Sequence, residues 1–383
     1  MNHYDYIICG AGCAGLSLAY RLTDERFRHL KILLLDKESK DKNDRTWSFW
    51  SDKPHLFDDI VIKQWNHINF YGNQSLQSLD IQPYSYQTIK GIDFYTYTLE
   101  SIEKCDHIDV KYEAIQDIRE SKSNLVEVET NCYTYTCQTA FNSIVKSYPS
   151  DDFHFVWQHF KGWIIESHTS FFDDTTATFM DFRINQAGET RFVYVLPYSP
   201  TTALVEATIF SKNRWDPTEY DPILKKYISD ILQLSDYKVL EEEHGAIPMT
   251  TSQFHKDQNR QIIPIGTLND SVKPSSGYAF IRIQEEAEEI AKKIKTTRDF
   301  KNRKRDRFTW YDRTLLDVII RKKESAKDIF SLMFEKNKPQ KIFQFLNEKT
   351  TVLAEANIFI TLPFWSFLSS FISSNVLKKT KAE

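Results

Sequence analysis

The sequence predicts an α/β protein with a Rossmann-like nucleotide-binding domain, an antiparallel-sheet domain and a C-terminal helical region. Three observations lead to this fold class. A glycine-rich turn joins an apolar run to a helical pattern near the N-terminus, alternating segments follow between about 156 and 257, and the chain becomes charged and helical from about 280. With 383 residues, the chain can bury a large core and form two or three domains.

The composition excludes several classes of protein. A net charge of -4 provides no broadly basic surface, so we expect no nucleic-acid partner. The five cysteines are scattered and form no CxxC pair, which favours a reducing compartment over a disulfide or zinc framework. No cluster of His, Cys and carboxylate residues has metal-ligand spacing, so no metal site is predicted. The first residues lead directly into an apolar strand without a basic n-region or cleavage site, so we expect no secretion signal and a cytoplasmic protein.

A strand, a tight turn and a helix are expected at the start of the chain. Residues 4–22 read YDYIICGAGCAGLSLAYRL, an apolar run followed by a glycine-rich turn and a helical pattern. The next apolar run, LKILLLDKE at 30–38, is continuous, as in a parallel strand that is covered on both faces. This run ends in Asp36, and the whole segment is predicted to form a βαβ unit.

The turn carries the GxGxxG motif of dinucleotide-binding folds. Gly10 permits the tight turn, Gly12 lets a pyrophosphate approach the helix N-terminus, and Gly15 allows close helix–strand packing. Ala11, between the first two glycines, belongs to the predicted binding segment. Asp36 is placed to accept hydrogen bonds from ribose hydroxyls. A glycine-rich turn without any ligand is the alternative.

The N-terminal position of the motif favours FAD over a nicotinamide cofactor, by analogy between folds. A second glycine-bearing segment supports this prediction. IIPIG is an apolar strand that ends at Gly266, and the chain then turns at Gly277 into a helix whose N-terminus could face a flavin ring. Arg45 is placed to reach ribose or pyrophosphate, although a surface arginine fits equally well. We therefore predict a Rossmann-like FAD-binding domain formed by 1–155 together with 258–295.

The middle of the chain is rich in expected strands. Runs such as NHINFYG and DFYTYTLE appear β-like between about 60 and 150, and part of 60–95 is free to join the substrate region. Residues 156–257 are predicted to form a substrate-binding sheet, with FKGWIIES, ATFMDFRI, TRFVYVLPYS and TALVEATIFS as its strands. An amphipathic helix is expected at 220–232, and 296–383 should be helical.

One carboxylate lies in an unusual setting. Within ALVEATIFS, residues 203–211, strand alternation places Glu206 on one face with Leu204 and Thr208. Ala207 lies on the opposite face. A strand that is buried on both faces disfavours an ionised glutamate. Glu206 is therefore either a solvated surface residue or an acid that depends on an apolar environment.

Several longer blocks carry a resemblance to a known family. The sequence resembles the flavoprotein lycopene β-cyclases of bacteria, within the wider family of FAD enzymes built like aromatic hydroxylases, over nearly the whole chain. Besides the glycine motif, the resemblance is carried by DRTWSFW (44–50), WQHFKGWIIE (157–166), MDFR (180–183), RFVYVLPYSPTTALVEATIFS (191–211), HGAIPM (244–249), IGTLNDSVKPSSGYAFIRIQ (265–284) and FTWYDRTLL (308–316).

The resemblance implies a reaction and its cofactors. Such enzymes cyclise the linear ψ ends of lycopene to β-ionone rings, through γ-carotene to β-carotene, without net redox change. They use reduced FAD, with NAD(P)H as the reductant. A proton adds to the terminal double bond, the neighbouring double bond attacks the resulting cation, and the ring cation loses a proton. Glu206 occupies the position of the glutamate in the family's acidic motif, so it is the predicted catalytic acid.

The sequence departs from the family pattern at two positions. Many relatives carry a second acidic residue where this chain has Ala207, so we expect Glu206 to act without an adjacent carboxylate. Relatives also tend to have glycine near Asp270, in a loop expected to pass close to the flavin. Asp270 could shift that loop or weaken flavin binding.

The implied substrate resides in bilayers, so we expect peripheral contact with a membrane surface. Residues 358–372, IFITLPFWSFLSSFI, are too short for a confident span, but their Phe and Trp content suits an interfacial segment. Basic runs at 298–307 and 378–381 could attract anionic headgroups. The alternative for 358–372 is a helix packed on the domain. The alternative for each basic run is a solvated helix face.

Two other functions remain open at this stage. The first is a redox enzyme on the same fold, either a monooxygenase or an isoprenoid double-bond reductase that acts on a hydrophobic substrate. The second is a flavoprotein that binds carotenoid or membrane without catalysis, which the departures at Ala207 and Asp270 would explain. The sequence leaves the oligomeric state open.

Overall fold

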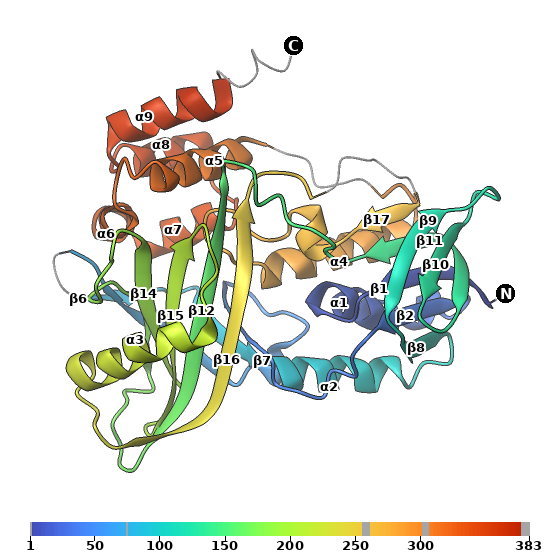
Figure 1. The fold of residues 1–383 in the computed structure, drawn as a ribbon, viewed down its shortest axis with the longest axis horizontal. Helices are drawn as coiled ribbons and strands as arrows, with labels where there is room; N and C mark the ends of the chain where they lie inside the picture. Colours follow the sequence, from blue (N-terminus) through green and yellow to red (C-terminus); the bar gives the residue numbers. More distant parts are fainter. Residues whose placement is uncertain (1, 74–75, 255–260, 301–305, 377–383) are drawn as a thin grey trace.

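The computed structural model describes residues 2–73, 76–254, 261–300 and 306–376. Two large sheets lie side by side along the longest axis of the molecule, and helices cover their faces (Figure 1). This mixed α/β architecture confirms the predicted fold class. The basic run at 378–381 and half of the run at 298–307 lie outside the described residues.

The first sheet contains the nucleotide motif and has the described strand order β8-β2-β1-β11-β10-β9, with β17 paired to β11. Strands β8, β2, β1, β11 and β17 are parallel, whereas β9 and β10 form an antiparallel hairpin at the edge. The strands are β1 (Asn2–Cys9), β2 (Ile32–Asp36), β8 (Ile108–Tyr112), β9 (Ile115–Glu120), β10 (Val126–Thr130), β11 (Thr134–Asn142) and β17 (Ile262–Pro264).

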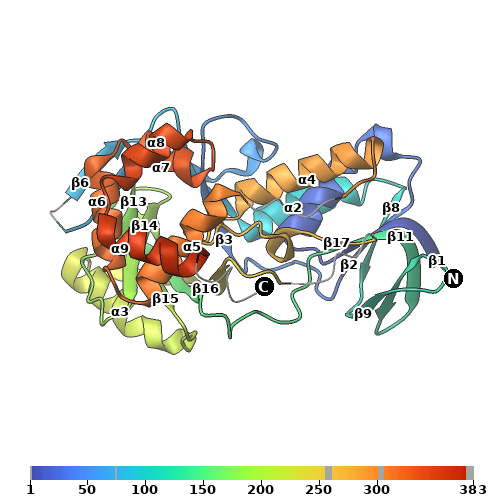
Figure 2. The ribbon, with the colours of Figure 1, turned by 90° about the horizontal axis from the view of Figure 1, so that it is seen from above.

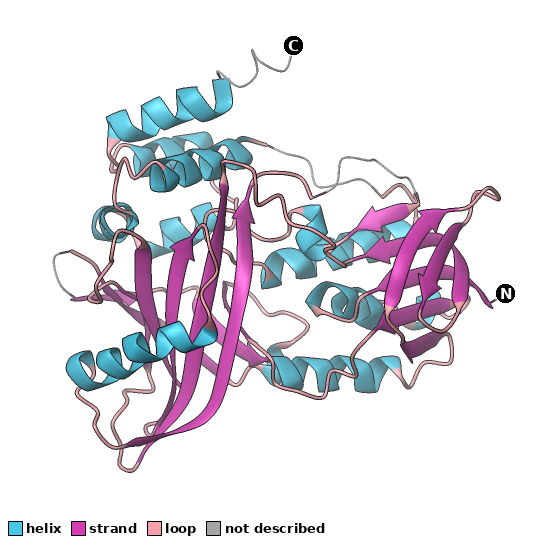
Figure 3. Ribbon diagram, viewed as in Figure 1, coloured by secondary structure: helices cyan, strands magenta, loops and turns pink. Residues whose placement is uncertain are grey.

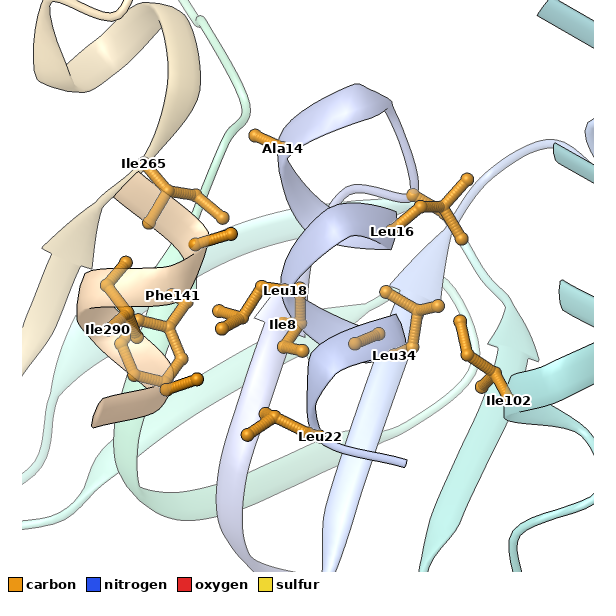
Figure 4. Packing of buried hydrophobic residues seen from close by; sticks show 14 of the residues in the cluster. Ile8, Ala14, Leu16, Leu18, Leu22, Leu34, Ile102, Phe141, Ile265 and Ile290 are labelled. Carbon is orange, nitrogen blue, oxygen red and sulfur yellow. The ribbon is translucent and has the colours of Figure 1, made fainter. Parts of the chain in front are cut away.

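Three helices pack beside this sheet: α1 (Cys13–Arg21), α2 (Gly91–Ile102) and α4 (Phe280–Lys295). Helix α1 lies between the other two, and its apolar face meets the sheet through Leu18 and Ile8 (Figure 4). Ile290 of α4 and Ile102 of α2 extend the same cluster on either side. The continuous apolar runs of β1 and β2 are therefore buried on both faces, as expected for parallel strands.

The second sheet has the described order β16-β12-β15-β14-β13-β5-β6, and its strands are long and mostly antiparallel (Figure 3). Strands β5 and β6, from within 60–95, join it through a parallel pairing with β13. The strands are β5 (His67–Tyr71), β6 (Leu76–Asp80), β12 (Phe155–Ser167), β13 (Thr176–Asp181), β14 (Thr190–Pro197), β15 (Thr202–Ser211) and β16 (Tyr237–Thr250). A third, small sheet is formed by β3 (Thr46–Ser51), β7 (Ser85–Lys90) and β4 (Lys63–Trp65).

Different helices cover the two faces of the second sheet. Helix α3 (Asp221–Lys226) continues into a π turn at Tyr227–Ile231 and packs on one face. The opposite face packs against the C-terminal helices, which gather above this sheet (Figure 2). These are α5 (Arg307–Ile320), α6 (Ala326–Lys336), α7 (Pro339–Leu346), α8 (Val352–Phe359) and α9 (Phe364–Phe371), followed by a π turn at Ile372–Val376. Short 3₁₀ turns lie at Glu25–Phe27, Asp58–Ile60, Pro217–Tyr220 and Gly266–Asn269.

One predicted strand is wrong. The segment DFYTYTLE, residues 93–100, is rich in β-formers, yet it lies within helix α2. Its buried residues recur at helical spacing, because Phe94, Thr98 and Ile102 all point inward. Packing of this face against the first sheet outweighs the local β propensity.

Candidate active site

The glycine motif forms the turn between β1 and α1, and two of its glycines are required by geometry. Gly10 has φ of +101°, a conformation that side chains with a Cβ rarely adopt. A Cβ on Gly15 would lie 1.8 Å from the Gly10 carbonyl oxygen, so only glycine allows the helix to pack this closely. A Cβ on Gly12 would meet no protein atom within 4 Å, which leaves open space over the N-terminus of α1. This arrangement fits a dinucleotide pyrophosphate.

Asp36 lies at the end of β2, beside the same turn. Its Oδ2 atom accepts a hydrogen bond from the Ala11 N–H at 2.6 Å, and its Oδ1 atom accepts one from the Glu38 N–H at 3.0 Å. Lys40 Nζ is 3.2 Å from Oδ1. Asp36 therefore stabilises the turn through these hydrogen bonds. Gly12 lines the cavity that begins at this turn, whereas Asp36 does not.

A cavity of about 390 Å³ extends from the N-terminus of α1 to the second sheet. Four of the predicted cofactor residues line it, namely Gly12, Arg45, Gly266 and Gly277. Gly266 and Gly277 both have positive φ, of +63° and +74°. Ala279 and Phe280, at the start of α4, also line the cavity, so a helix N-terminus borders it as the sequence predicted.

Asp270 adopts φ of +56°, a left-handed conformation that accounts for a preference for glycine in this loop. Aspartate tolerates this conformation better than most residues. Its carbonyl oxygen accepts a hydrogen bond from Arg282 Nη2 at 2.9 Å, and its side chain is not part of the cavity lining. The loop at Asp270 therefore keeps its left-handed turn, and the Asp270 side chain does not occupy the cavity.

Glu206 lies on β15 at the far end of this cavity. Val205 and Ala207 pack in the cluster under α3, whereas Leu204 belongs to the cluster on the opposite face, as the alternation predicted. The remaining accessible surface of Glu206 is explained by its place in the cavity lining.

The environment of Glu206 favours its protonated form. Burial raises the pKa of this carboxyl group well above its ordinary range, and the nearby charge of Glu243 raises it further. The Thr208 hydroxyl donates to Glu206 Oε1 at 2.9 Å and offsets part of this pKa shift. Glu206 is therefore a buried acid and not a solvated surface residue.

Glu243 is the second buried carboxylate of the cavity, and sequence reasoning missed it. It lies on β16, and burial raises its pKa; the charges of Glu241 and Asp44 act in the same direction. The Thr46 hydroxyl donates to its Oε2 atom at 2.6 Å and, with Lys90, partly opposes the pKa shift. Position 207 carries no acid, as the sequence shows, but a second carboxylate reaches the same cavity from another strand.

Aromatic hydroxyls surround the cavity near the two carboxylates. The hydroxyl of Tyr278 is 3.2 Å from that of Tyr86 and 3.5 Å from that of Tyr194. All three rings line the cavity, and burial raises the pKa of each phenol, so the hydroxyls stay neutral. Trp47 also lines it, whereas Trp50 packs behind Tyr278 with ring centroids 4.3 Å apart.

Two further polar groups of the cavity have no hydrogen-bond partner among the described residues. These are Gln158 Oε1 and Ser276 Oγ, both buried. Buried polar atoms without partners are rare in native proteins and point to a ligand or water. In the described ranges no group of His, Cys, Asp and Glu residues is arranged to hold a metal ion.

Comparisons with known proteins agree with this arrangement. The model of the family described as lycopene cyclase protein matches residues 5–371. A lycopene beta-cyclase of Pantoea ananas is 23% identical over 292 residues, which cover 72% of this chain and 71% of that protein.

Solved structures show the fold. A geranylgeranyl bacteriochlorophyll reductase-like protein from Thermoplasma acidophilum aligns with a TM-score of 0.56 at 12% identity, covering 100% of this chain and 99% of its own. The halogenase PltM, solved in complex with phloroglucinol and FAD, aligns with a TM-score of 0.56 at 13% identity, covering 90% of this chain and 82% of its own. The family match over nearly the whole length decides the assignment: the chain belongs to the lycopene cyclase family.

Proposed function

We propose that the protein is an FAD-dependent lycopene β-cyclase, an isomerase that converts the linear ψ ends of lycopene to β-ionone rings without net redox change. The observation that carries this proposal is Glu206, a buried acid with a raised pKa in a cavity that extends to the nucleotide motif. Membership of the lycopene cyclase family supports the choice of substrate.

Cofactor binding follows from the residues at the nucleotide end of the cavity. The backbone around Gly12 and the N-terminus of α1 would hold the FAD pyrophosphate, and Arg45, Gly266 and Gly277 would border the flavin. The halogenase PltM has this fold and was solved with FAD. Reduced FAD supplies negative charge that stabilises carbocations, and we propose NAD(P)H as its reductant.

Glu206 supplies the proton that starts the reaction. Its burial keeps the proton on the carboxyl group until an alkene accepts it, because the ionised form is disfavoured in this cavity. The faces of Tyr86, Tyr194 and Tyr278 border the same space and can stabilise a developing cation. The cavity also limits water, which would otherwise capture that cation.

The test uses purified protein, reduced FAD and lycopene under anaerobic conditions. The wild type should yield ringed carotenoid, whereas Glu206→Gln should keep its flavin and lose cyclisation by at least about 100-fold, the usual range for a lost general acid. Full activity of Glu206→Gln would remove Glu206 as the acid. In a second assay with NAD(P)H and air, consumption of one NAD(P)H per product would instead indicate a monooxygenase or isoprenoid reductase, since a cyclase needs reductant only to charge the flavin.

Peripheral membrane association is part of the proposal. None of the helices within the described ranges combines the length and the apolar character needed to cross a bilayer. Helices α8 and α9 expose large apolar side chains to solvent, including Leu353 (74% exposed), Ile360 (78%), Phe364 (57%) and Trp365 (78%). Exposed Trp and Phe residues are typical of interfacial segments. Under this surface lies an apolar cavity of about 330 Å³ that α9 lines with Phe367, Leu368 and Phe371.

A further inference from the structure

We propose that Glu206 and Glu243 form a proton-sharing pair in which Glu206 protonates the alkene and Glu243 removes the ring proton. This inference rests on the proposed function and adds a second reacting group to it. Family resemblance assigns a role only to Glu206, and Glu243 enters through the geometry of the sheet.

Strand register brings the two carboxylates to one place. Glu206 of β15 pairs with Gly162 of β12, and Gly162 pairs with Glu243 of β16. The backbones of β15 and β16 are therefore roughly 10 Å apart at this level, two strand spacings. All three residues point to the same face because directly paired residues share a face of the sheet.

Gly162 adds no side chain of its own between the two carboxylate side chains. A Cβ on Gly162 would lie 3.3 Å from Glu243 Cγ and 3.4 Å from Glu206 Cβ. The two carboxylate side chains thus flank the position that any other residue would fill. Both line the same cavity, so a substrate that reaches one also lies close to the other.

Glu243 has an oxygen atom available for this role. Thr46 binds Oε2, but Oε1 is buried and has no hydrogen-bond partner among the described residues. An anionic oxygen in that situation is costly unless a ligand or a proton satisfies it. Gln158 and Ser276, beside Gly277, also leave partnerless oxygens in the same cavity, so the unsatisfied atoms mark a space for ligands.

The surrounding charges do not neutralise both carboxylates. Lys90 lowers the pKa of Glu243 and Arg45 lines the cavity, but Lys90 binds Glu241 at 3.2 Å and Arg45 binds Asp44 at 2.6 Å. The phenols of Tyr86, Tyr194 and Tyr198, which feel the charge of Glu206, stay neutral because burial raises the pKa of each. The charge of ionised Glu243 raises the pKa of Glu206 beyond the effect of burial, which favours the state with one proton on Glu206.

The reaction balances with this single proton. The O–H bond of Glu206 breaks as a C–H bond forms at the terminal double bond, and the cation appears on the adjacent carbon. The next double bond supplies the electron pair of the new ring C–C bond. A ring C–H bond then breaks, its electrons form the ring double bond, and its proton passes to Glu243. Return of that proton to Glu206 resets the pair, and no oxidant or reductant is consumed.

The first arm of the test needs no substrate. Infrared titration of protein with ¹³C-labelled glutamate carboxyls compares wild type, Glu206→Gln, Glu243→Gln and a control, Glu242→Gln. Glu242 lies next in sequence on β16 and is exposed, paired with Lys161. We expect each cavity variant to lower the pKa of the remaining carboxyl, because the like charge is gone, and the control to change neither. An unchanged Glu206 titration in Glu243→Gln would overturn the pairing.

The second arm measures cyclisation against pH. Activity needs Glu206 protonated and Glu243 ionised, so the wild type should show a bell-shaped profile. Glu243→Gln should lower turnover by about 100-fold or more, remove the acid limb and move the alkaline limb to lower pH. Glu243→Asp should partly restore the acid limb of the profile. A wild-type pH profile in Glu243→Gln would contradict the role of Glu243 as the base. If wild-type protein shows the paired titration but cyclises no carotenoid, the proposed function fails and the pair stands.

Discussion

Glu206 and Glu243 border one cavity from strands that are not neighbours, and the intervening strand carries glycine, Gly162, at the paired position. Burial raises the pKa of both carboxyl groups. An acid for alkene protonation needs this setting, since its charged form must be disfavoured until the transition state. The sheet register therefore links the fold to the proposed chemistry.

Gly162→Ala tests the space between the carboxylates. The added Cβ would lie 2.8 Å from Leu204 Cδ1 and within 3.4 Å of both glutamate side chains, so these side chains must move. We expect a loss of about 1–3 kcal/mol in the free energy of unfolding, typical of overpacking, with a larger loss of cyclisation than of flavin binding. Chemical denaturation, turnover and titration with FAD measure the three effects. Unchanged turnover would show that the spacing of the carboxylates is unimportant.

Gly12→Ala and Gly15→Ala should separate cofactor binding from folding. The Gly12 Cβ would meet no protein atom within 4 Å, whereas the Gly15 Cβ would lie 1.8 Å from a backbone oxygen. We expect Gly12→Ala to keep the stability of the apoprotein and to weaken FAD binding by at least about tenfold, or roughly 1.4 kcal/mol. Gly15→Ala should destabilise the fold. Fluorescence titration with FAD and thermal unfolding of the apoprotein measure both, and normal FAD affinity of Gly12→Ala would place the pyrophosphate elsewhere.

Ala207→Asp restores the acidic residue that many relatives carry. Ala207 is buried under α3, on the face away from the cavity. A carboxylate there should cost roughly 3 kcal/mol or more as an unpaired buried charge, without any gain in cyclisation. Urea denaturation and turnover measure the outcome. Higher turnover would mean that position 207 serves the reaction and that Glu243 is not the partner.

Exposed aromatic residues of α9 should determine membrane binding. Phe364→Ser with Trp365→Ser removes two exposed apolar side chains, so the free energy of unfolding should change by less than about 0.5 kcal/mol. Co-sedimentation with phospholipid vesicles should fall at least about fivefold, as expected for lost interfacial burial. Tyr133→Ser is the matched control, since Tyr133 is 62% exposed on the far, nucleotide-binding side. Equal vesicle binding by all three proteins would exclude α9 as the contact.

Local patterns predicted the strand, turn and helix of the glycine motif and the face of Glu206. The motif around Gly10–Gly15 depends on a short turn, and the alternation around Glu206 depends on one strand, so neighbouring residues suffice for both. Helix α2 was missed because burial at Phe94 and Thr98 overrides the β propensity of its sequence.

Glu243 could not be predicted for a different reason. It ends an acidic run, residues 241–243, that resembles a solvated surface, and two of the three glutamates are indeed exposed. Only the register of β16 against β12 turns the third into the cavity. Such long-range pairing is set by the whole sheet and leaves no local signal beyond strand alternation.

The most direct measurement expresses the protein in a lycopene-accumulating bacterium and separates the pigments by chromatography, with Glu206→Gln as the comparison. We expect wild-type cells to convert lycopene to ringed carotenoids and cells with the flavin-loaded variant to keep lycopene. Unchanged lycopene in cells that contain folded, flavin-loaded wild-type protein would contradict it.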